Sequence, residues 1–255
     1  MSSNEKRFDS PSVTVCIPVL NAENELGNSI LRLDAFLKTT SFKSYKIQIA
    51  DNGSTDRTAT IGRQLAHEIP NVIYSRTEQR GRGRALRGCW QSANTSIVSY
   101  MDVDLSTDLC SFSPLISALT EGGADIAVGS RRAHGASVRR NFGRRFITHV
   151  FNSMLRHGFC LDLSDTQCGF KALKTSAAKT VLPLIRNNNW FFDTELLLVA
   201  KRLPLTIAEV PVVWSDGQNP STVNIPKTSL EMASGLLRMK FVPLRSLSQN
   251  EKPNS

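Results

Sequence analysis

The sequence predicts an α/β fold: a mostly parallel sheet with helices on both faces. Strand-length apolar runs alternate with segments of helical spacing, and the connections between them are short. The chain has 255 residues, of which 40% are hydrophobic, and this fits one large domain with a substantial core. We expect a single domain over residues 12–245, a disordered lead-in over 1–11 and a disordered tail over 246–255.

The first half of the chain carries the regular alternation. Apolar, β-branched runs predict strands at 12–18, 45–50 and 71–75, a strand that ends at Asp102, and a strand at 125–129. Apolar residues at helical spacing predict helices at 23–37, about 83–93 and about 110–120. A further helix should run to about Glu68, with Ser54 or Thr55 as its N-cap.

The alternation breaks after residue 130. A basic segment runs to about residue 145, and an amphipathic stretch continues to Phe159. Helices are expected at about 175–185, from Trp190 to about 201, and at 228–239, with an extended segment at 205–214.

Positive charge is concentrated in one part of the chain. The net charge is +9, and residues 129–161 contain no Asp or Glu. Such a block favours a phosphate-bearing partner: nucleic acid, anionic lipid or a phosphorylated substrate. A solvated basic face is the alternative interpretation. The same stretch contains Arg131, Arg132, Arg139, Arg140, Arg144, Arg145 and Arg156.

The cysteines and the hydropathy pattern indicate the cellular compartment. Five dispersed cysteines without Cys-x-x-Cys spacing argue against a disulfide framework or a zinc site, and favour a reducing cytosol. No run of about 20 apolar residues is present, so we expect no transmembrane span. The first residues lack an apolar region, so we expect no secretory signal.

Polar residues stand where the predicted strands end. In open α/β sheets, ligands bind beyond the carboxyl ends of the strands. Those ends here carry Asp51, the pair Asp102 and Asp104, and Arg131. Two carboxylates one residue apart suit Mg²⁺, which takes one or two protein carboxylates and leaves other positions to water and phosphate. An Asp-x-Asp sequence is also common on ordinary surface turns.

The motifs, taken in order, resemble those of family 2 glycosyltransferases of the GT-A fold. Within that family the chain is most similar to dolichyl- or polyprenyl-phosphate hexosyltransferases, and to their glucosyl branch in particular. It departs from the first motif at Leu20, where an aromatic is usual, and at Ala22, where an acid is usual. The matching segments are 17–23, 51–56, 81–83, 102–106, 129–131, 165–171 and 192–197.

The resemblance implies that residues 12–105 form the nucleotide-sugar half. It implies that Asp102 and Asp104 hold Mg²⁺ or Mn²⁺ against the diphosphate, a Lewis-acid role toward the leaving group. Glycines around Arg82 would let the backbone pass close to the nucleotide while guanidinium groups face phosphate. The full donor set is Pro18, Asn21, Glu23, Asp51, Gly53, Arg82, Asp102, Val103 and Asp104.

Residues 106–245 would form the acceptor half. A lipid phosphate is already an anion, so it can attack the anomeric carbon without losing a proton; Arg131, Arg139 and Arg140 would bind it. A hydroxyl acceptor would instead need a general base, for which Asp193 is the first candidate and Asp165 the second. Asp193 has an alternative role as a helix cap, and Asp165 as a brace for the acceptor loop. The expected catalytic set is Asp104, Arg131, Asp193 and Asp165.

The expected activity is a metal-dependent, inverting transfer of a hexose to a polyprenyl phosphate. UDP-glucose is the favoured donor, with GDP-mannose open, and the expected location is cytoplasmic, peripheral at the cytosolic membrane face. Residues 146–155 are the better candidates for membrane contact, whereas the final helix fits core packing better. The alternatives are a transferase acting on a soluble hydroxyl, a sugar nucleotidyltransferase, and a basic binding module without enzymatic activity. We expect no nucleic-acid partner, and the oligomeric state stays open.

Overall fold

A computed structural model describes residues 10–139, 143–215 and 225–241 of the chain. Its main feature is a seven-stranded sheet with the order β3-β2-β1-β4-β7-β5-β8. All neighbours are parallel except β7, which runs antiparallel to β4 and β5. The strands are β1 (Ser12–Val19), β2 (Ser44–Asp51), β3 (Val72–Arg76), β4 (Ile97–Met101), β5 (Ile126–Ser130), β7 (Phe170–Lys174) and β8 (Ile207–Pro211).

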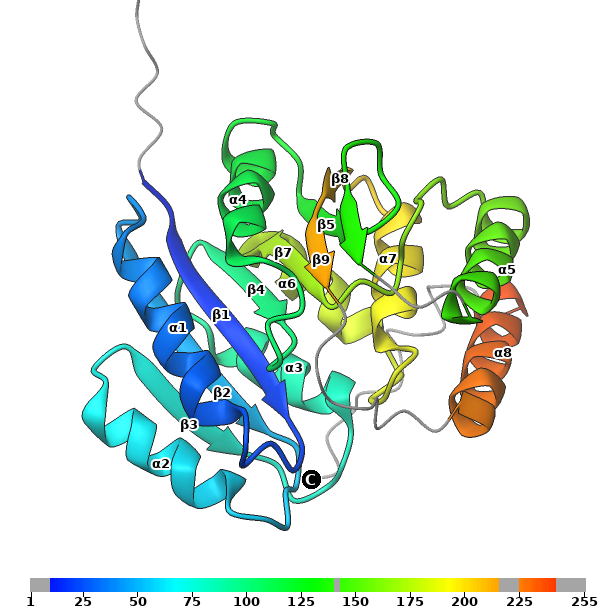
Figure 1. The fold of residues 1–255 in the computed structure, drawn as a ribbon. Coiled ribbons are helices and arrows are strands. Elements are labelled where there is room, and N and C mark those ends of the chain that lie inside the picture. Colours follow the sequence, from blue (N-terminus) through cyan, green and yellow to red (C-terminus); the bar gives the residue numbers. More distant parts are fainter. Residues whose placement is uncertain (1–9, 140–142, 216–224, 242–255) are drawn as a thin grey trace, which may run out of the picture.

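Helices cover both faces of this sheet and form two cores (Figure 1). One core contains side chains of α1 (Leu26–Lys38), α2 (Thr58–Glu68) and α4 (Phe112–Thr120). The other contains side chains of α3 (Arg82–Ser92), α6 (Thr175–Val181), α7 (Phe192–Lys201) and α8 (Ile225–Phe241). Strand β1 shows the alternation behind this division, because Val15 and Ile17 enter the first core and Cys16 the second. The predicted fold class is confirmed.

Strand β7 is the member of the main sheet that the sequence pattern did not predict as a strand. It lies between two parallel strands and is almost fully buried. Phe170 and Ala172 face one core and Leu173 the other. Lys171 is also fully buried, and a charged residue in a short run obscures the apolar pattern of a central strand. The insertion of β7 brings residues 168–171 directly beside the end of β4.

Helices α1 and α2 begin later in the chain than predicted. Helix α1 begins at Leu26 rather than Glu23, and α2 begins at Thr58. The predicted N-cap of α2 is wrong, because the backbone N–H of Ser54 donates to Asp51 Oδ1 and that of Thr55 to Asn21 Oδ1. Residues 54 and 55 therefore belong to a loop that is tied to the strand ends.

The second half contains short additional elements. The predicted extended segment divides into β8 and β9 (Val213–Ser215), and β9 pairs with the short strand β6 (Ser137–Arg139). Helix α5 (Gly143–Phe159) occupies the predicted amphipathic stretch. Single 3₁₀ turns, Leu109–Ser111 and Leu182–Leu184, precede α4 and follow α6. The predicted tail and most of the predicted lead-in lie outside the described residues.

Helix α8 has apolar side chains on two faces. Met232, Leu236 and Met239 are buried in the core, as predicted for a packing helix. Leu230 and Phe241 are each 73% exposed, and Leu237 is also exposed. Of the residues preferred for membrane contact, Met154 is exposed and Leu155 is buried, while the side chains of 146–150 lie outside the described set.

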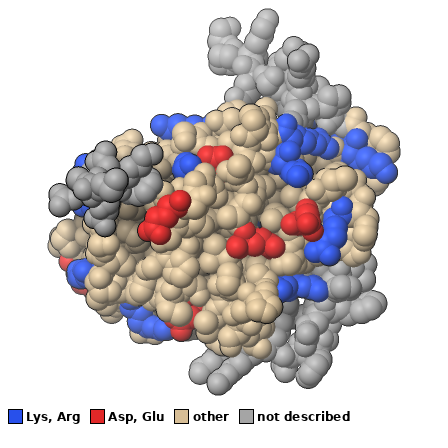
Figure 2. Space-filling view, turned by 90° about the horizontal axis from the view of Figure 1, so that it is seen from above, with Lys and Arg blue, Asp and Glu red and all other residues tan. Residues whose placement is uncertain are grey.

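Charge and hydropathy of the described residues add two observations. In the view of Figure 2, acidic side chains lie near the middle of the face and several basic ones lie along one side of it. Within residues 10–139, 143–215 and 225–241, no helix combines the length and the apolarity that crossing a bilayer requires.

Candidate active site

The candidate site lies where β1, β2 and β4 end, and hydrogen bonds between two loops form its rim. Asn21 has a left-handed backbone (φ 53°), and its N–H donates to Ser54 Oγ over 3.0 Å. Glu23 Oε2 accepts the backbone N–H and the Nε–H of Arg57, both over 3.1 Å. The structure thus places the predicted donor residues Asn21 and Glu23 at the rim, where their side chains join the loops after β1 and β2.

Asp51 is completely buried at the end of β2. Its Oδ2 accepts the hydroxyl of Tyr74 over 2.6 Å and lies 3.6 Å from an Arg76 nitrogen, and its Oδ1 accepts the Ser54 N–H over 2.8 Å. Desolvation, and then the adjacent Asp51 carboxylate, raise the pKa of Tyr74 to about 12, so the phenol remains a hydrogen-bond donor at neutral pH. Asp51 is therefore held rigidly below the rim.

The segment after Asp51 requires glycine. Gly53 has a φ of 76°, and a Cβ there would lie 3.3 Å from the carbonyl oxygen of Glu78. The side chain of Asn52 accepts the backbone N–H of Gly81 from the opposite loop. The loops after β2 and β3 consequently approach each other closely beside the predicted nucleotide position.

The carboxylates of Asp102 and Asp104 follow β4 directly. Asp102 is 45% exposed and accepts a hydrogen bond from Arg82 Nη2 over 2.7 Å. Asp104 is exposed, and its Oδ1 accepts the Ser106 N–H over 3.0 Å; Val103 between them is half-buried. Exposed carboxylate oxygens are hard ligands that suit Mg²⁺ or Mn²⁺. In the described part of the chain no larger group of His, Cys, Asp and Glu gathers as a metal cluster. The residues present therefore fit a cation shared with a phosphate ligand.

Arg82 lies between two carboxylates rather than free to face phosphate. One nitrogen bonds Asp102 and another bonds Asp193, and the side chain is 11% exposed. Its guanidinium carbon lies 5.0 Å from the ring centroid of Tyr100 and 5.2 Å from that of Trp190. Arg82 thus connects the exposed carboxylate of the predicted donor side with a buried one.

Asp193 is buried in the first turn of α7, where Arg82, Tyr100 and Lys171 all donate to its carboxylate. Burial alone would raise the pKa of Asp193, but the charges of Lys171 and Arg82 outweigh it and lower the pKa below its usual value. Its oxygens bond these side chains and make no N-cap contact, and the N-cap of α7 is Phe191. The helix-cap interpretation of Asp193 is wrong.

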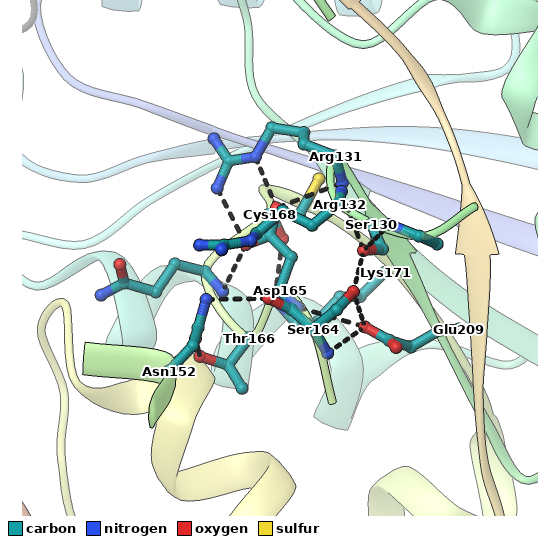
Figure 3. A network of polar contacts seen from close by, with 12 residues as sticks. Ser130, Arg131, Arg132, Asn152, Ser164, Asp165, Thr166, Cys168, Lys171 and Glu209 are labelled. Atoms are coloured by element: carbon teal, nitrogen blue, oxygen red, sulfur yellow. Dashed lines mark hydrogen bonds and ion pairs between the residues drawn. The ribbon is translucent and has the colours of Figure 1, made fainter. Parts of the chain in front are cut away.

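Arg131 and Asp165 form a bidentate ion pair (Figure 3). Arg131 donates from Nε over 2.6 Å and from Nη2 over 3.0 Å, and its backbone N–H donates to the same carboxylate over 3.2 Å. Desolvation opposes ionisation of Asp165, but the hydrogen bonds and charge of Arg131 lower its pKa. This geometry supports the interpretation of Asp165 as a brace.

A hydrogen-bonded network below this pair fixes the loop that carries Asp165. Glu209 Oε1, from β8, accepts the N–H of Ser164 over 2.7 Å and the N–H of Asp165 over 3.1 Å. The hydroxyls of Ser130 and Ser164 lie 2.6 Å apart, and Asn152 of α5 donates to the Ser164 carbonyl over 2.9 Å. Figure 3 shows these groups converging from β5, β8 and α5.

Several residues of the site were absent from the predictions. Tyr100, Lys171, Glu209 and Trp190 all contact predicted site residues. Lys171 stood inside a motif quoted for the resemblance, and its burial follows once 170–174 is a central strand. The phosphate ligands Arg139 and Arg140 remain predictions: the side chain of Arg139 and all of Arg140 lie outside the described residues.

The Arg131–Asp165 pair should make stability sensitive to acid. The pKa of Asp165 is lower in the folded state than in the unfolded state. Its contribution to stability is therefore present above the unfolded pKa of about 3.9, and it is lost as the pH falls through the pKa of the folded state. We expect the free energy of unfolding of the wild type to decrease below about pH 4. The free energy of unfolding of Asp165→Asn should decrease less steeply over the same pH range. Urea unfolding between pH 3 and 6 measures this. The exposed Asp162→Asn is the control, and identical slopes for Asp165→Asn and wild type would contradict the expectation.

Comparison with known proteins establishes the family. The chain matches Glycosyl transferase family 2 over residues 14–182, more than half of its length. The chain belongs to this family, so the predicted enzyme class, a glycosyltransferase, is confirmed. The segment matched contains the ends of β1, β2 and β4 and the buried strand β7.

Individual relatives span most of this chain. Glycosyltransferase AglD of Haloferax volcanii is 31% identical over 231 residues, which are 89% of this chain but 36% of that protein. Dolichyl-phosphate beta-glucosyltransferase of Drosophila melanogaster is 31% identical over 82% of this chain and 69% of its own length. The protein of that name in Dictyostelium discoideum is 27% identical over 93% of this chain and 76% of its own length.

A solved structure supports the fold assignment. Glucosyl-3-phosphoglycerate synthase of Mycobacterium tuberculosis, crystallised with Mn²⁺ and uridine-diphosphate-glucose, superposes with a TM-score of 0.67. The two sequences are 19% identical, and the match covers 91% of this chain and 80% of that one. At this identity the likeness concerns the fold.

Proposed function

We propose that this protein transfers glucose from UDP-glucose, with inversion, to a polyprenyl or dolichyl phosphate at a membrane surface. The proposal combines family membership with one observation in the site. Asp193, the best candidate for a general base, is buried and ionised, and three side chains donate to it. A transferase without a free base suits an acceptor that is already an anion.

The donor side would act through Asp102 and Asp104. Their exposed oxygens would hold Mg²⁺ or Mn²⁺, which when bound supplies Lewis-acid stabilisation of the departing diphosphate. The relatives' names mention glucosyl transfer, and the solved structure of similar fold carries Mn²⁺ with UDP-glucose. Buried Asp51 would set the shape of the nucleotide pocket, together with the rim formed by Asn21, Gly53 and Glu23 and with Pro18 at the end of β1.

The acceptor side would use Arg131 and its neighbours. Asp165 engages Nε and Nη2 of Arg131, and Nη1 lies outside this pair. An acceptor phosphate could therefore bond Nη1 while the pair keeps the guanidinium oriented. Arg139 and Arg140 would supply additional contacts to the acceptor phosphate. An acceptor embedded in lipid would bring the protein to the cytosolic face of a membrane.

A hydroxyl acceptor is the second candidate function. It would require Asp193 to accept a proton, although Lys171 and Arg82 lower its pKa and thereby weaken it as a base. Asp165 is equally engaged by Arg131. Both carboxylates thus favour the phosphate acceptor over the hydroxyl.

A donor panel tests the proposal. Purified protein is incubated with Mn²⁺ or Mg²⁺, polyprenyl phosphate in detergent, and radiolabelled UDP-glucose or GDP-mannose. We expect label in the organic phase with UDP-glucose, dependent on metal and on lipid phosphate, because Asp102 and Asp104 would hold the cation and Arg131 would bind the acceptor phosphate. If only GDP-mannose gave labelled lipid, the donor would be GDP-mannose rather than UDP-glucose. If neither donor gave labelled lipid, the proposal would be overturned.

A further inference from the structure

We propose that Gly169 and Lys171 are positioning residues, which hold Asp102 and Asp193 in place at the centre of the site. The inference rests on the proposed function for the reaction in which these carboxylates act, and it adds residues for which that proposal has no role. Both residues belong to one short segment, Cys168 to Lys171, at the start of β7. This segment contacts both carboxylates.

Gly169 provides the space that Asp102 occupies. A Cβ built on Gly169 would lie 1.9 Å from Oδ2 and 2.5 Å from Cγ of Asp102, far closer than atoms can approach. The register of β4 with β7 creates this contact. The two strands are antiparallel and Met101 pairs with Phe170, so Asp102, which follows Met101, comes to lie beside Gly169, which precedes Phe170. Any side chain at 169 must therefore displace Asp102 from its present position beside Arg82.

Lys171 is fully buried, and its ammonium group has three acceptors. They are the Cys168 carbonyl at 2.7 Å, the Tyr100 hydroxyl at 3.0 Å and Asp193 Oδ1 at 3.2 Å. The three N–H groups of a lysine are thus all used. A buried ammonium group is costly unless paired, so an apolar residue would serve packing better. Its presence points to control of the orientation and charge of Asp193.

The two carboxylates are also connected to each other. Lys171 donates a hydrogen bond to Asp193, and Arg82 donates to both Asp193 and Asp102. Two cations balance two carboxylates along this line. Loss of Lys171 would leave Asp193 with Arg82 as its remaining cation, and would pull Arg82 from Asp102.

A double-mutant cycle tests the role of Lys171. We expect Lys171→Met to lower kcat by about a hundredfold, the size of effect that a misplacement of 1 Å can cause, with little change in the KM for donor. Because Lys171 acts through Asp193, Lys171→Met should cause little further loss in an Asp193→Asn background. Lys174→Met, on the same strand but in a partly exposed pair with Asp125, is the matched control and should keep the wild-type kcat.

Two results would overturn this role. One is a kcat for Lys171→Met equal to that of Lys174→Met. The other is a loss that adds in full to that of Asp193→Asn, as expected for a residue that only supports the fold. If Lys171→Met does not fold, Lys171→Gln, which keeps a donor without the charge, takes its place in the same cycle.

Metal binding tests the role of Gly169 independently of transfer. Calorimetric titration of Mn²⁺ into protein saturated with UDP should give a Kd raised about tenfold or more in Gly169→Ala, since residues that orient a metal ligand are worth about 10–100-fold in affinity. Gly88→Ala is the control, because a Cβ at Gly88 meets nothing within 4 Å. An unchanged Mn²⁺ Kd in Gly169→Ala would overturn the proposal. If wild type makes no lipid product, the proposed function fails while this titration still decides the role of Gly169.

Discussion

Asp104→Asn is expected to lower the rate of glucosyl transfer by about a thousandfold, because a Lewis-acid metal contributes several kcal/mol to the stabilisation of the transition state. Asp104 is exposed, and it accepts a hydrogen bond from the Ser106 N–H, which the amide oxygen of an asparagine can also accept. The melting temperature should therefore stay near that of wild type. Initial rates with UDP-glucose at saturating Mn²⁺ measure the loss.

Asp108→Asn provides the control for Asp104→Asn. Asp108 is an exposed carboxylate in the same loop, and it caps a 3₁₀ turn by accepting the Cys110 N–H, which asparagine does equally well. The substitution removes the same charge a few residues away and should leave the rate unchanged. Equal rates for the two variants would remove Asp104 from the metal site.

Arg131→Met is expected to lower the free energy of unfolding by about 3–5 kcal/mol, because it leaves the buried carboxylate of Asp165 without its cation. For a chain of this size, that corresponds to a fall in melting temperature on the order of 10 °C. Adding Asp165→Leu should restore much of the loss, since an apolar pair tolerates burial. Urea and thermal unfolding of the single and double variants measure both effects.

An exposed ion pair gives the comparison for Arg131→Met. Arg156 pairs with Asp162, and their side chains are 53% and 88% exposed. Arg156→Met should change stability by less than about 1 kcal/mol, as is usual for surface pairs. If Arg131→Met were no less stable than Arg156→Met, the Arg131–Asp165 pair would not be the brace of the acceptor loop.

The sequence was sufficient for the parts of the fold that depend on local pattern. Strands β1, β2 and β4 were predictable because each is a short run rich in apolar and β-branched residues, with a polar residue at its end or just beyond it. The meeting of Asp51, Asp102 and Asp104 at one edge then followed from parallel strand direction. Asn21 and Glu23 fell at this edge for the same reason.

Pairings between distant segments were not predictable in the same way. Arg82 was expected to face phosphate, but it bonds two carboxylates that lie 20 and 111 residues away in the chain. The helix-cap interpretation of Asp193 was plausible from its position, yet side chains from α3, β4 and β7 converge on it. Such contacts depend on the insertion of β7 between β4 and β5, and no local pattern in the sequence indicates that strand order.

The most direct test of the central claim compares two acceptors that differ only in the phosphate. Purified protein, Mn²⁺ and labelled UDP-glucose are supplied with either polyprenyl phosphate or the matching polyprenol, and the lipid product is extracted and counted. The proposed acceptor arginine, Arg131, and the engaged Asp193 predict label on the phosphate and none on the alcohol. Transfer to polyprenol at a comparable rate would contradict the account. A hydroxyl acceptor needs a general base, and Asp193 is already engaged by Lys171 and Arg82.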